Sequence, residues 1–263
     1  MKRRNKAILI VLLVLTAVSL IVFGFPDIIR LRDETFDALL SDTVPRLTGG
    51  IFLICLLFFG SERRYLLPER KGIGRAFLWS IPCFLVAVVN FPFSALITGS
   101  ATVMRVDLLW IFLLKCFSVA LLEEAFFRGL LLPVFEKSFQ KHRYAQLFAV
   151  LVSATLFALF HLINLAFGGG VGDTLLQVGY TFLTGAMFAV MLLKTGNLWL
   201  CVLAHFLFDV GGLLVFELGD GDPQDTVFWI LTAVIGVLCL IHIVLTLVAL
   251  MRKEDRNNKT PAE

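Results

Sequence analysis

Two adjacent glutamates, Glu123 and Glu124, lie inside an apolar stretch long enough to cross a membrane. A carboxylate at the centre of a bilayer costs about 2.5–3.5 kcal/mol on insertion scales, so such residues usually face a protein-lined cavity and mark chemistry or transport. Two other apolar stretches carry the histidines His161 and His205. A carboxylate can take a proton from water and an imidazole N–H can stabilise an oxyanion, so together these groups indicate hydrolysis.

The spacing of the charged residues predicts different roles for the two glutamates. Glu124 and Arg128 are four residues apart, with the acid first, which is the favourable order for an ion pair on a helix. Glu123 is rotated by about 100° from Glu124 around the helix. We therefore expect Arg128 to neutralise Glu124, and Glu123 to face His161 and His205 across a cavity that opens toward the cytoplasmic half.

Two further polar residues share faces with the histidines. Asp209 is four residues after His205, and Asn164 is three residues after His161. Either Asp209 or Asn164 could assist an imidazole at an oxyanion. The same groups could instead bind zinc, with His161, His205 and Glu123 as ligands, although no HExxH motif is present.

Composition shows which elements must position these residues. The chain is 59% hydrophobic and 16% charged, against about 25% charged in soluble domains, which predicts an all-α polytopic membrane protein. We expect about eight transmembrane helices in a bundle-like or conical arrangement around an intramembrane cavity, within a single domain, 1–263. The expected spans are Ala7–Phe25, Leu47–Gly60, Arg75–Ile97, Asp107–Leu132, Leu147–Phe167, Leu175–Leu193, Leu198–Phe216 and Val227–Met251.

Prolines and charged residues add detail to this topology. Pro82 and Pro92 predict a kink in the third span, and Pro133 predicts the end of the fourth. Lysines and arginines collect in segments 1–6, 61–75, 137–143 and 252–259, whereas segment 217–226 has four acids and no base. Because positive loops stay in the cytoplasm, both termini are expected to be cytoplasmic. No basic stripe suggests a nucleic-acid partner.

Three blocks in this sequence resemble the CAAX-processing and bacteriocin-processing (CPBP, or ABI) family of intramembrane proteases. The family pattern is Glu-Glu-x-x-x-Arg, then Phe-x-x-x-His, then His-x-x-x-Asn or Asp, on successive helices. The corresponding residues here are Glu123 to Arg128, Phe157 to His161, and His205 to Asp209. The three blocks occur in the family's order, and each lies on an expected span. The family-like catalytic core is expected to cover residues 107–216.

The resemblance implies an endopeptidase in which Glu123 activates water. Glu124 and His161 would support the site, and His205 with position 209 would form the oxyanion pocket. An ionised Asp209 cannot donate to an oxyanion, so it would have to be protonated, orient His205, or ligate a cation. No cofactor is expected, and a zinc-dependent version is the alternative. The expected partners are a membrane-associated peptide or protein substrate and the lipid bilayer.

Two readings from other functional classes remain open. The cavity could belong to a non-catalytic immunity or scaffold protein that binds a peptide or partner helix. The ionisable residues could also relay protons in a carrier, but the sequence shows no internal repeat of the kind common in transporters. The compact eight-span form with short loops suggests a bacterial cytoplasmic membrane, where small membrane-bound peptides or membrane proteins would be the substrates.

Overall fold

The computed structural model describes residues 3–23, 31–68 and 72–259, and these residues are almost entirely helical. The prediction of an all-α polytopic membrane protein is confirmed, since six helices in the described part are long and apolar enough to cross a bilayer. The helices are α1 (Arg3–Phe23), α2 (Glu34–Phe59), α3 (Ile73–Val89), α4 (Phe93–Thr98), α5 (Leu109–Glu124), α6 (Leu132–Phe139), α7 (Ala145–Phe160), α8 (Val171–Thr195), α9 (Leu198–Leu218) and α10 (Thr226–Lys259).

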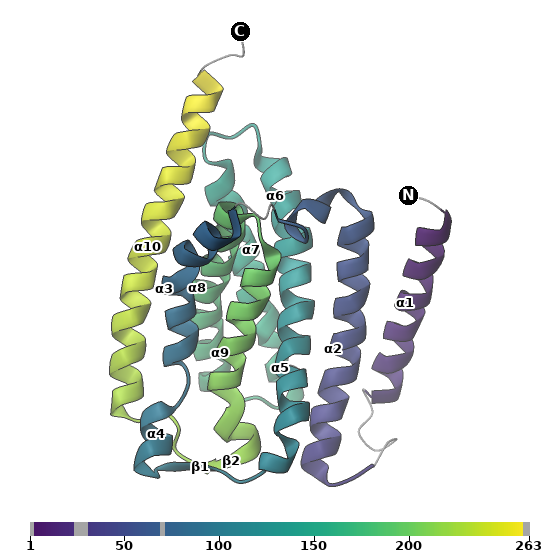
Figure 1. Cartoon of the computed structure of the whole chain (residues 1–263), viewed down its shortest axis with the longest axis vertical. Helices are drawn as coiled ribbons and strands as arrows, with labels where there is room; N and C mark the ends of the chain where they lie inside the picture. The colour runs from purple at the N-terminus through teal and green to yellow at the C-terminus, as the bar shows by residue number, and fades with distance from the viewer. Residues whose placement is uncertain (1–2, 24–30, 69–71, 260–263) are drawn as a thin grey trace.

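Short elements connect or extend these helices. They are η1 (Ser61–Tyr65), η3 (Val106–Leu108), the π-helix η4 (Ala125–Leu131), the 3₁₀ helix η5 (His161–Phe167), and the strands β1 (Ala101–Val103) and β2 (Gly219–Gly221). The two strands pair antiparallel, with Thr102 opposite Asp220. They close one end of the bundle beside α4, while α1 begins and α10 ends at the other end (Figure 1). The long helices therefore lie roughly parallel between two distinct ends.

The core lies where α2, α5, α8 and α9 meet. Its buried members include Leu57 on α2, Ala120 on α5, Met191 on α8 and Cys201 on α9. The helix α1 lies at the edge of the bundle against α2 (Figure 1). Small residues on α2 allow close packing on α5: a Cβ at Gly50 would lie 3.0 Å from Leu121 Cγ. This contact fixes α5 immediately before its paired glutamates.

The second span is longer than the sequence predicted. Helix α2 begins at Glu34, where Asp33 caps it by accepting a hydrogen bond from the Phe36 amide, and it runs through Pro45. Polar residues in its first half lower the local hydropathy, so this part of the helix was not predicted as a span. In the structure the charge of Asp42 is balanced by ion pairs with Arg46 at 2.6 Å and with Lys115 of α5 at 3.0 Å.

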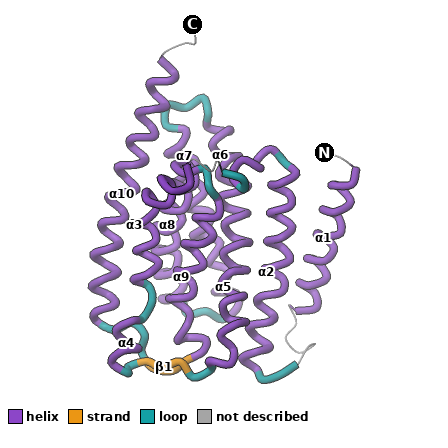
Figure 2. The backbone as a smooth tube through the Cα atoms, viewed as in Figure 1, coloured by secondary structure: helices purple, strands orange, loops and turns teal. Residues whose placement is uncertain are grey.

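The two proline predictions had different outcomes. The third span does change direction at Pro92, where α3 ends and α4 begins after a short break. The prediction that the fourth span ends at Pro133 is wrong, because α6 continues through it to Phe139. The π-helix η4 lies directly before α6 and places Pro133 in the first turn of α6, where a missing N–H is tolerated. Figure 2 shows the resulting continuous helical path through α5 and α6.

Candidate functional site

The paired glutamates are the last two residues of α5, at the point where the helix changes its winding. From Ala125 to Leu131 the chain forms the π-helix η4, and the Leu132 amide donates to the Phe127 carbonyl, five residues earlier. Single π-turns inside α-helices are rare and occur frequently at functional sites. The change of winding therefore marks the same residues as the sequence motif does.

Glu124 and Arg128 form the expected ion pair, and both side chains are fully buried. The Arg128 Nη1 atom lies 3.2 Å from Glu124 Oε1. A buried charge without a partner is strongly destabilising, so each of these residues depends on the other. The pair lies between α5 and the first π-turn, and it fixes the side of the helix on which Glu124 lies.

Three phenylalanine rings surround the Arg128 guanidinium. Its Cζ atom lies 4.2 Å from the ring centre of Phe157, 5.5 Å from that of Phe188 and 5.8 Å from that of Phe127. Gly185 of α8 makes room for this arrangement, because a Cβ there would lie 3.0 Å from the Phe157 ring and 3.2 Å from Arg128 Nη2. The negative ring faces stabilise a cation that water cannot reach.

His205 of α9 joins the two glutamates. Its Nδ1 atom lies 2.8 Å from Glu124 Oε1, while its Nε2 atom lies 3.8 Å from Glu123 Oε2 and 3.5 Å from Asp209 Oδ2. The imidazole also stacks on Phe188, with ring centres 5.5 Å apart. A hydrogen bond from Nδ1–H to Glu124 fixes the orientation of the ring, so Nε2 faces the two remaining carboxylates.

Glu123 is the less engaged of the two glutamates. Its side chain retains 15% exposure, and within the described part of the chain its carboxylate accepts no hydrogen bond. Glu124 is fully buried and is bound by Arg128 and His205. The two carboxylates thus differ in their contacts, since Glu124 is bound on both sides and Glu123 keeps part of its side chain exposed.

His161 lies at the end of α7 and lines the same cavity as His205. Its Nδ1 atom is 2.9 Å from the Phe157 carbonyl. The cavity is small, about 50 Å³, and is bounded by residues of α7, η5, α8 and α9 that include His161, His205 and Asp209. The structure therefore places Glu123 and Asp209 near His205 by distance, and His161 lines one cavity together with His205 and Asp209 but not with Glu123.

The cavity lining follows α8 over several turns. Phe188, which stacks on His205, lines the cavity together with Gln177 and Tyr180, which lie nearer the start of α8. The start of α8 lies toward the β1–β2 end, because α8 ends where α9 begins and α9 ends at β2. The lining therefore reaches toward the β1–β2 end of the bundle, and the prediction of an opening toward the cytoplasmic half stays a prediction.

Asn164 contacts a residue that the sequence analysis did not identify. Its Nδ2 atom donates to Gln177 Oε1 at 2.8 Å, which joins η5 to α8. Gln177, Thr181, Thr184 and Phe188 form one side of the cavity. Their spacing of four, three and four residues places them on one face of α8. Gln177, Thr181 and Thr184 are polar residues on one face of an apolar helix, and this pattern could have predicted the wall of the site from the sequence. None of the three is ionisable, so the search for ionisable residues did not identify them.

The zinc alternative would use Glu123, His161 and His205 as ligands. In residues 3–23, 31–68 and 72–259, no three His, Cys, Asp or Glu side chains are grouped so that they could hold a metal ion. The Nδ1 atom of His205 faces Glu124, and the Nδ1 atom of His161 faces a backbone carbonyl. Zinc binding by Glu123, His161 and His205 therefore stays a prediction.

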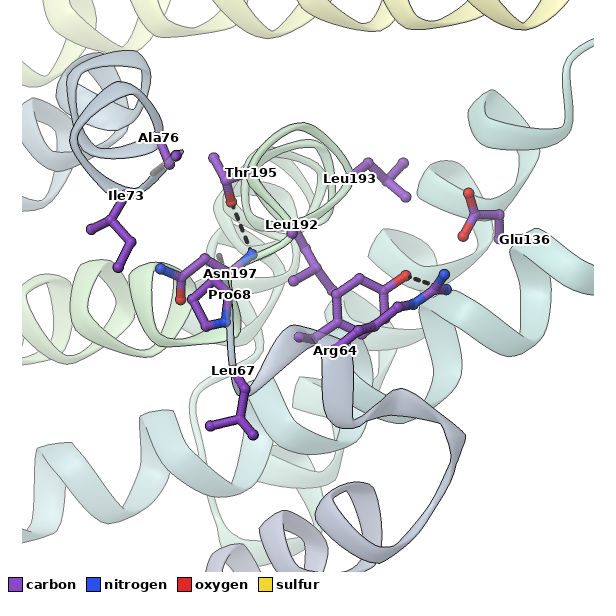
Figure 3. A pocket seen from close by; sticks show the side chains of 13 residues that line it. Arg64, Leu67, Pro68, Ile73, Ala76, Glu136, Leu192, Leu193, Thr195 and Asn197 are labelled. Atoms are coloured by element: carbon purple, nitrogen blue, oxygen red, sulfur yellow. Dashed lines mark hydrogen bonds between the residues drawn. The ribbon is translucent and has the colours of Figure 1, made fainter. Parts of the chain in front are cut away.

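A larger cavity of about 680 Å³ lies at the end of the bundle where α8 passes into α9. Its lining includes Arg64, Glu136 and Asn197, and the Arg64 guanidinium donates to the Tyr65 hydroxyl (Figure 3). None of the residues of the three sequence blocks lines it. Its size is typical of a ligand pocket, but the grouped ionisable residues lie elsewhere.

A known protein family matches the part of the chain that contains the residues of the site. Residues 105–211 match the family model described as type II CAAX prenyl endopeptidase Rce1-like. This range includes Glu123, Arg128, His161, His205 and Asp209. Neither the curated proteins nor the solved structures contain a match. This match supports the resemblance of residues 105–211 to the CAAX-processing and bacteriocin-processing family of intramembrane proteases.

Proposed function

We propose that this multi-pass membrane protein is an intramembrane endopeptidase in which Glu123 activates water. The observation that carries the proposal is the contrast between the paired glutamates. Glu124 is fixed by Arg128 and His205, whereas Glu123 has a free carboxylate 3.8 Å from His205 Nε2. A general base needs both a free lone pair and access to water, and only Glu123 of this pair has them.

The proposed reaction begins with a water molecule bound between Glu123 and the substrate carbonyl. Glu123 takes a proton from the water as its oxygen attacks the carbonyl carbon, and the electron pair of the C=O bond moves onto oxygen. When this oxyanion reforms the carbonyl, the C–N bond breaks and the protonated Glu123 delivers its proton to the leaving nitrogen. The products are a carboxylic acid and an amine, and Glu123 returns to its initial form.

The other residues act on this reaction without supplying the proton. His205 directs Nε2 toward the reacting groups, because Glu124 fixes its Nδ1 at 2.8 Å. Asp209, at 3.5 Å from Nε2, orients the imidazole from the opposite side. His161 lines the cavity and contacts the polar part of the substrate. Arg128 neutralises the charge of Glu124 and so stabilises this carboxylate in its buried position.

The proposed substrate is a peptide segment of a membrane-associated peptide or protein. The grouped residues lie between helices long enough to span a bilayer, so the scissile bond must reach them within the membrane. The matching family is described by its action on prenylated CAAX sequences. A prenyl chain anchors a peptide in the bilayer, and so does any other apolar segment, so we propose membrane anchorage as the shared requirement.

The experiment compares the terminal peptides of membranes that contain the wild-type chain, Glu123→Gln or Glu136→Gln. The amide keeps the shape of glutamate but cannot accept the proton, so Glu123→Gln should abolish new peptide termini while the protein remains abundant. Glu136 lies on α6, outside the site, and serves as the matched control. Full cleavage by Glu123→Gln would refute the proposed base. Binding of a membrane peptide without any new terminus would instead favour the non-catalytic scaffold.

A further inference from the structure

The proposed reaction creates an oxyanion in a site that already contains negative charge. Glu123, Glu124 and Asp209 all lie within 4 Å of His205. Carboxylates accept hydrogen bonds but do not donate them when ionised. An oxyanion usually needs preorganised donors close to the reacting oxygen, and the Nδ1–H of neutral His205 is already bonded to Glu124, so the cavity should contain another neutral donor.

The cavity wall formed by α8 offers several polar groups, but most are used within the helix. Thr181 Oγ1 donates to the Gln177 carbonyl at 2.6 Å, and Thr184 Oγ1 donates to the Thr181 carbonyl at 3.4 Å. These hydroxyl hydrogens point back along α8. The side-chain amide of Gln177 is different, because it also lines the cavity but takes no part in a bond to the α8 backbone among the described residues.

The contact with Asn164 determines which end of the Gln177 amide is free. Asn164 Nδ2 donates to Gln177 Oε1 at 2.8 Å, so the oxygen is engaged and the –NH₂ group keeps its two donors. The Gln177 side chain also interacts with the side chain of Tyr180, which lines the cavity together with Asp209 and His205. Asn164 therefore orients Gln177 with a donor on the cavity side.

We propose that Gln177 is a catalytic residue whose amide N–H stabilises the oxyanion, and that Asn164 is its positioning residue. The assignment rests on the proposed endopeptidase function and adds to it a donor on α8, outside the three sequence blocks. It also explains how the site works with an aspartate at position 209. Asp209 orients His205, and the neutral amide of Gln177 supplies the donor that Asp209 lacks.

The test uses the full-length chain, purified and reconstituted into liposomes with membrane proteins extracted from cells that lack it. Initial rates of new terminus formation are measured over a dilution series of those membrane proteins, which separates apparent kcat from apparent KM. Gln177→Met keeps the side-chain length and apolar volume but has no donor. Its kcat should fall by about 10²–10³, the effect of losing one oxyanion donor, with little change in KM.

Two further variants complete the design. Asn164→Ala keeps the Gln177 amide donor but removes the hydrogen bond that orients it. Its kcat should therefore fall by less than in Gln177→Met, again with little change in KM. Gln146→Met is the matched control, because Gln146 lies in the first turn of α7 and does not line the cavity. Thermal unfolding midpoints of all variants show whether a loss of rate reflects a loss of folded protein.

The outcomes separate this assignment from the function on which it rests. Wild-type cleavage with an unchanged kcat in Gln177→Met would overturn the role of Gln177 and leave the endopeptidase intact. A higher KM at unchanged kcat would also overturn it, because the residue would then only bind substrate. Absence of any new terminus with the wild-type chain would overturn both. A selective fall in kcat, with folding unchanged, would establish the donor.

Discussion

The buried pair of Arg128 and Glu124 allows a quantitative prediction. In Arg128→Met, Glu124 would keep His205 as a partner but lose the only cation of fixed charge that contacts it in the described part of the chain. The other carboxylate oxygen of Glu124 already has no hydrogen-bond partner there. Removing one member of a buried ion pair typically costs about 3–5 kcal/mol, so we expect a loss of this size in the free energy of unfolding.

A second variant tests whether the loss arises from the unpaired charge. In Arg128→Met with Glu124→Gln, both charges are absent, and the glutamine oxygen can still accept the hydrogen bond from His205 Nδ1. Replacing a whole buried pair by uncharged groups is often nearly neutral, so the double variant should be more stable than Arg128→Met. The coupling free energy of the cycle should lie at about 1–3 kcal/mol, within the range for contacting residues.

The assay is unfolding of the purified chain in mixed micelles with increasing denaturing detergent. Arg64→Met is the matched control, because this guanidinium is 61% exposed and lies 3.5 Å from Glu62 outside the spans. Its effect should remain within about 0.5 kcal/mol. The structural reasoning would be wrong if Arg128→Met kept the wild-type stability. It would also be wrong if the loss of stability in the double variant equalled the sum of the losses in Arg128→Met and Glu124→Gln.

Three other outcomes follow from the structure. Hydrogen bonds from Arg105 lower the pKa of Asp33 and Asp107 below the ordinary value of 3.8, so their stabilisation is complete above that pH and is lost as the pH falls below it. Unfolding midpoints should fall less steeply with acid in Arg105→Met. Gly211→Ala should strongly reduce folded protein, because its Cβ would lie 2.7 Å from the Phe91 backbone nitrogen in the break after α3. Gly179→Ala meets nothing within 4 Å and should stabilise α8 by about 1 kcal/mol, as thermal unfolding can show. Chelators should leave terminus formation unchanged, since the proposed base needs no metal, and restoration of lost activity by zinc would refute this.

Local spacing predicted the parts of the site that lie on one helix. The pair of Glu124 and Arg128 follows from four-residue spacing, and the break at Pro92 follows from the missing donor of proline. The start of α2 could not be predicted in this way. Asp42 makes that segment look polar, and its compensation by Lys115 depends on another helix, which hydropathy along one segment does not reveal.

The wall formed by α8 shows the same limit in the candidate site. Gln177 is a neutral residue in an apolar helix, and its importance arises from Asn164 on η5 and from the position of the cavity. Likewise, nothing in the sequence indicated that Phe188 would stack on His205. Contacts between helices decide these features, and a single sequence provides only the residues that each helix contributes.

The π-helix η4 gives this chain an unusual sensitivity to changes in length. A π-turn contains one residue more than the α-turn it replaces, and each residue of an α-helix turns the following side chains by about 100°. Deletion of one residue between Ala125 and Leu131 could restore regular α-helical winding without breaking the chain path. It would leave α6 close to its present orientation relative to α5, because the Leu132 amide would then lie four residues after Phe127 and could keep its bond to that carbonyl as an α-helical one. A one-residue deletion in this segment should therefore change the winding beside the paired glutamates more than it changes the packing of α6.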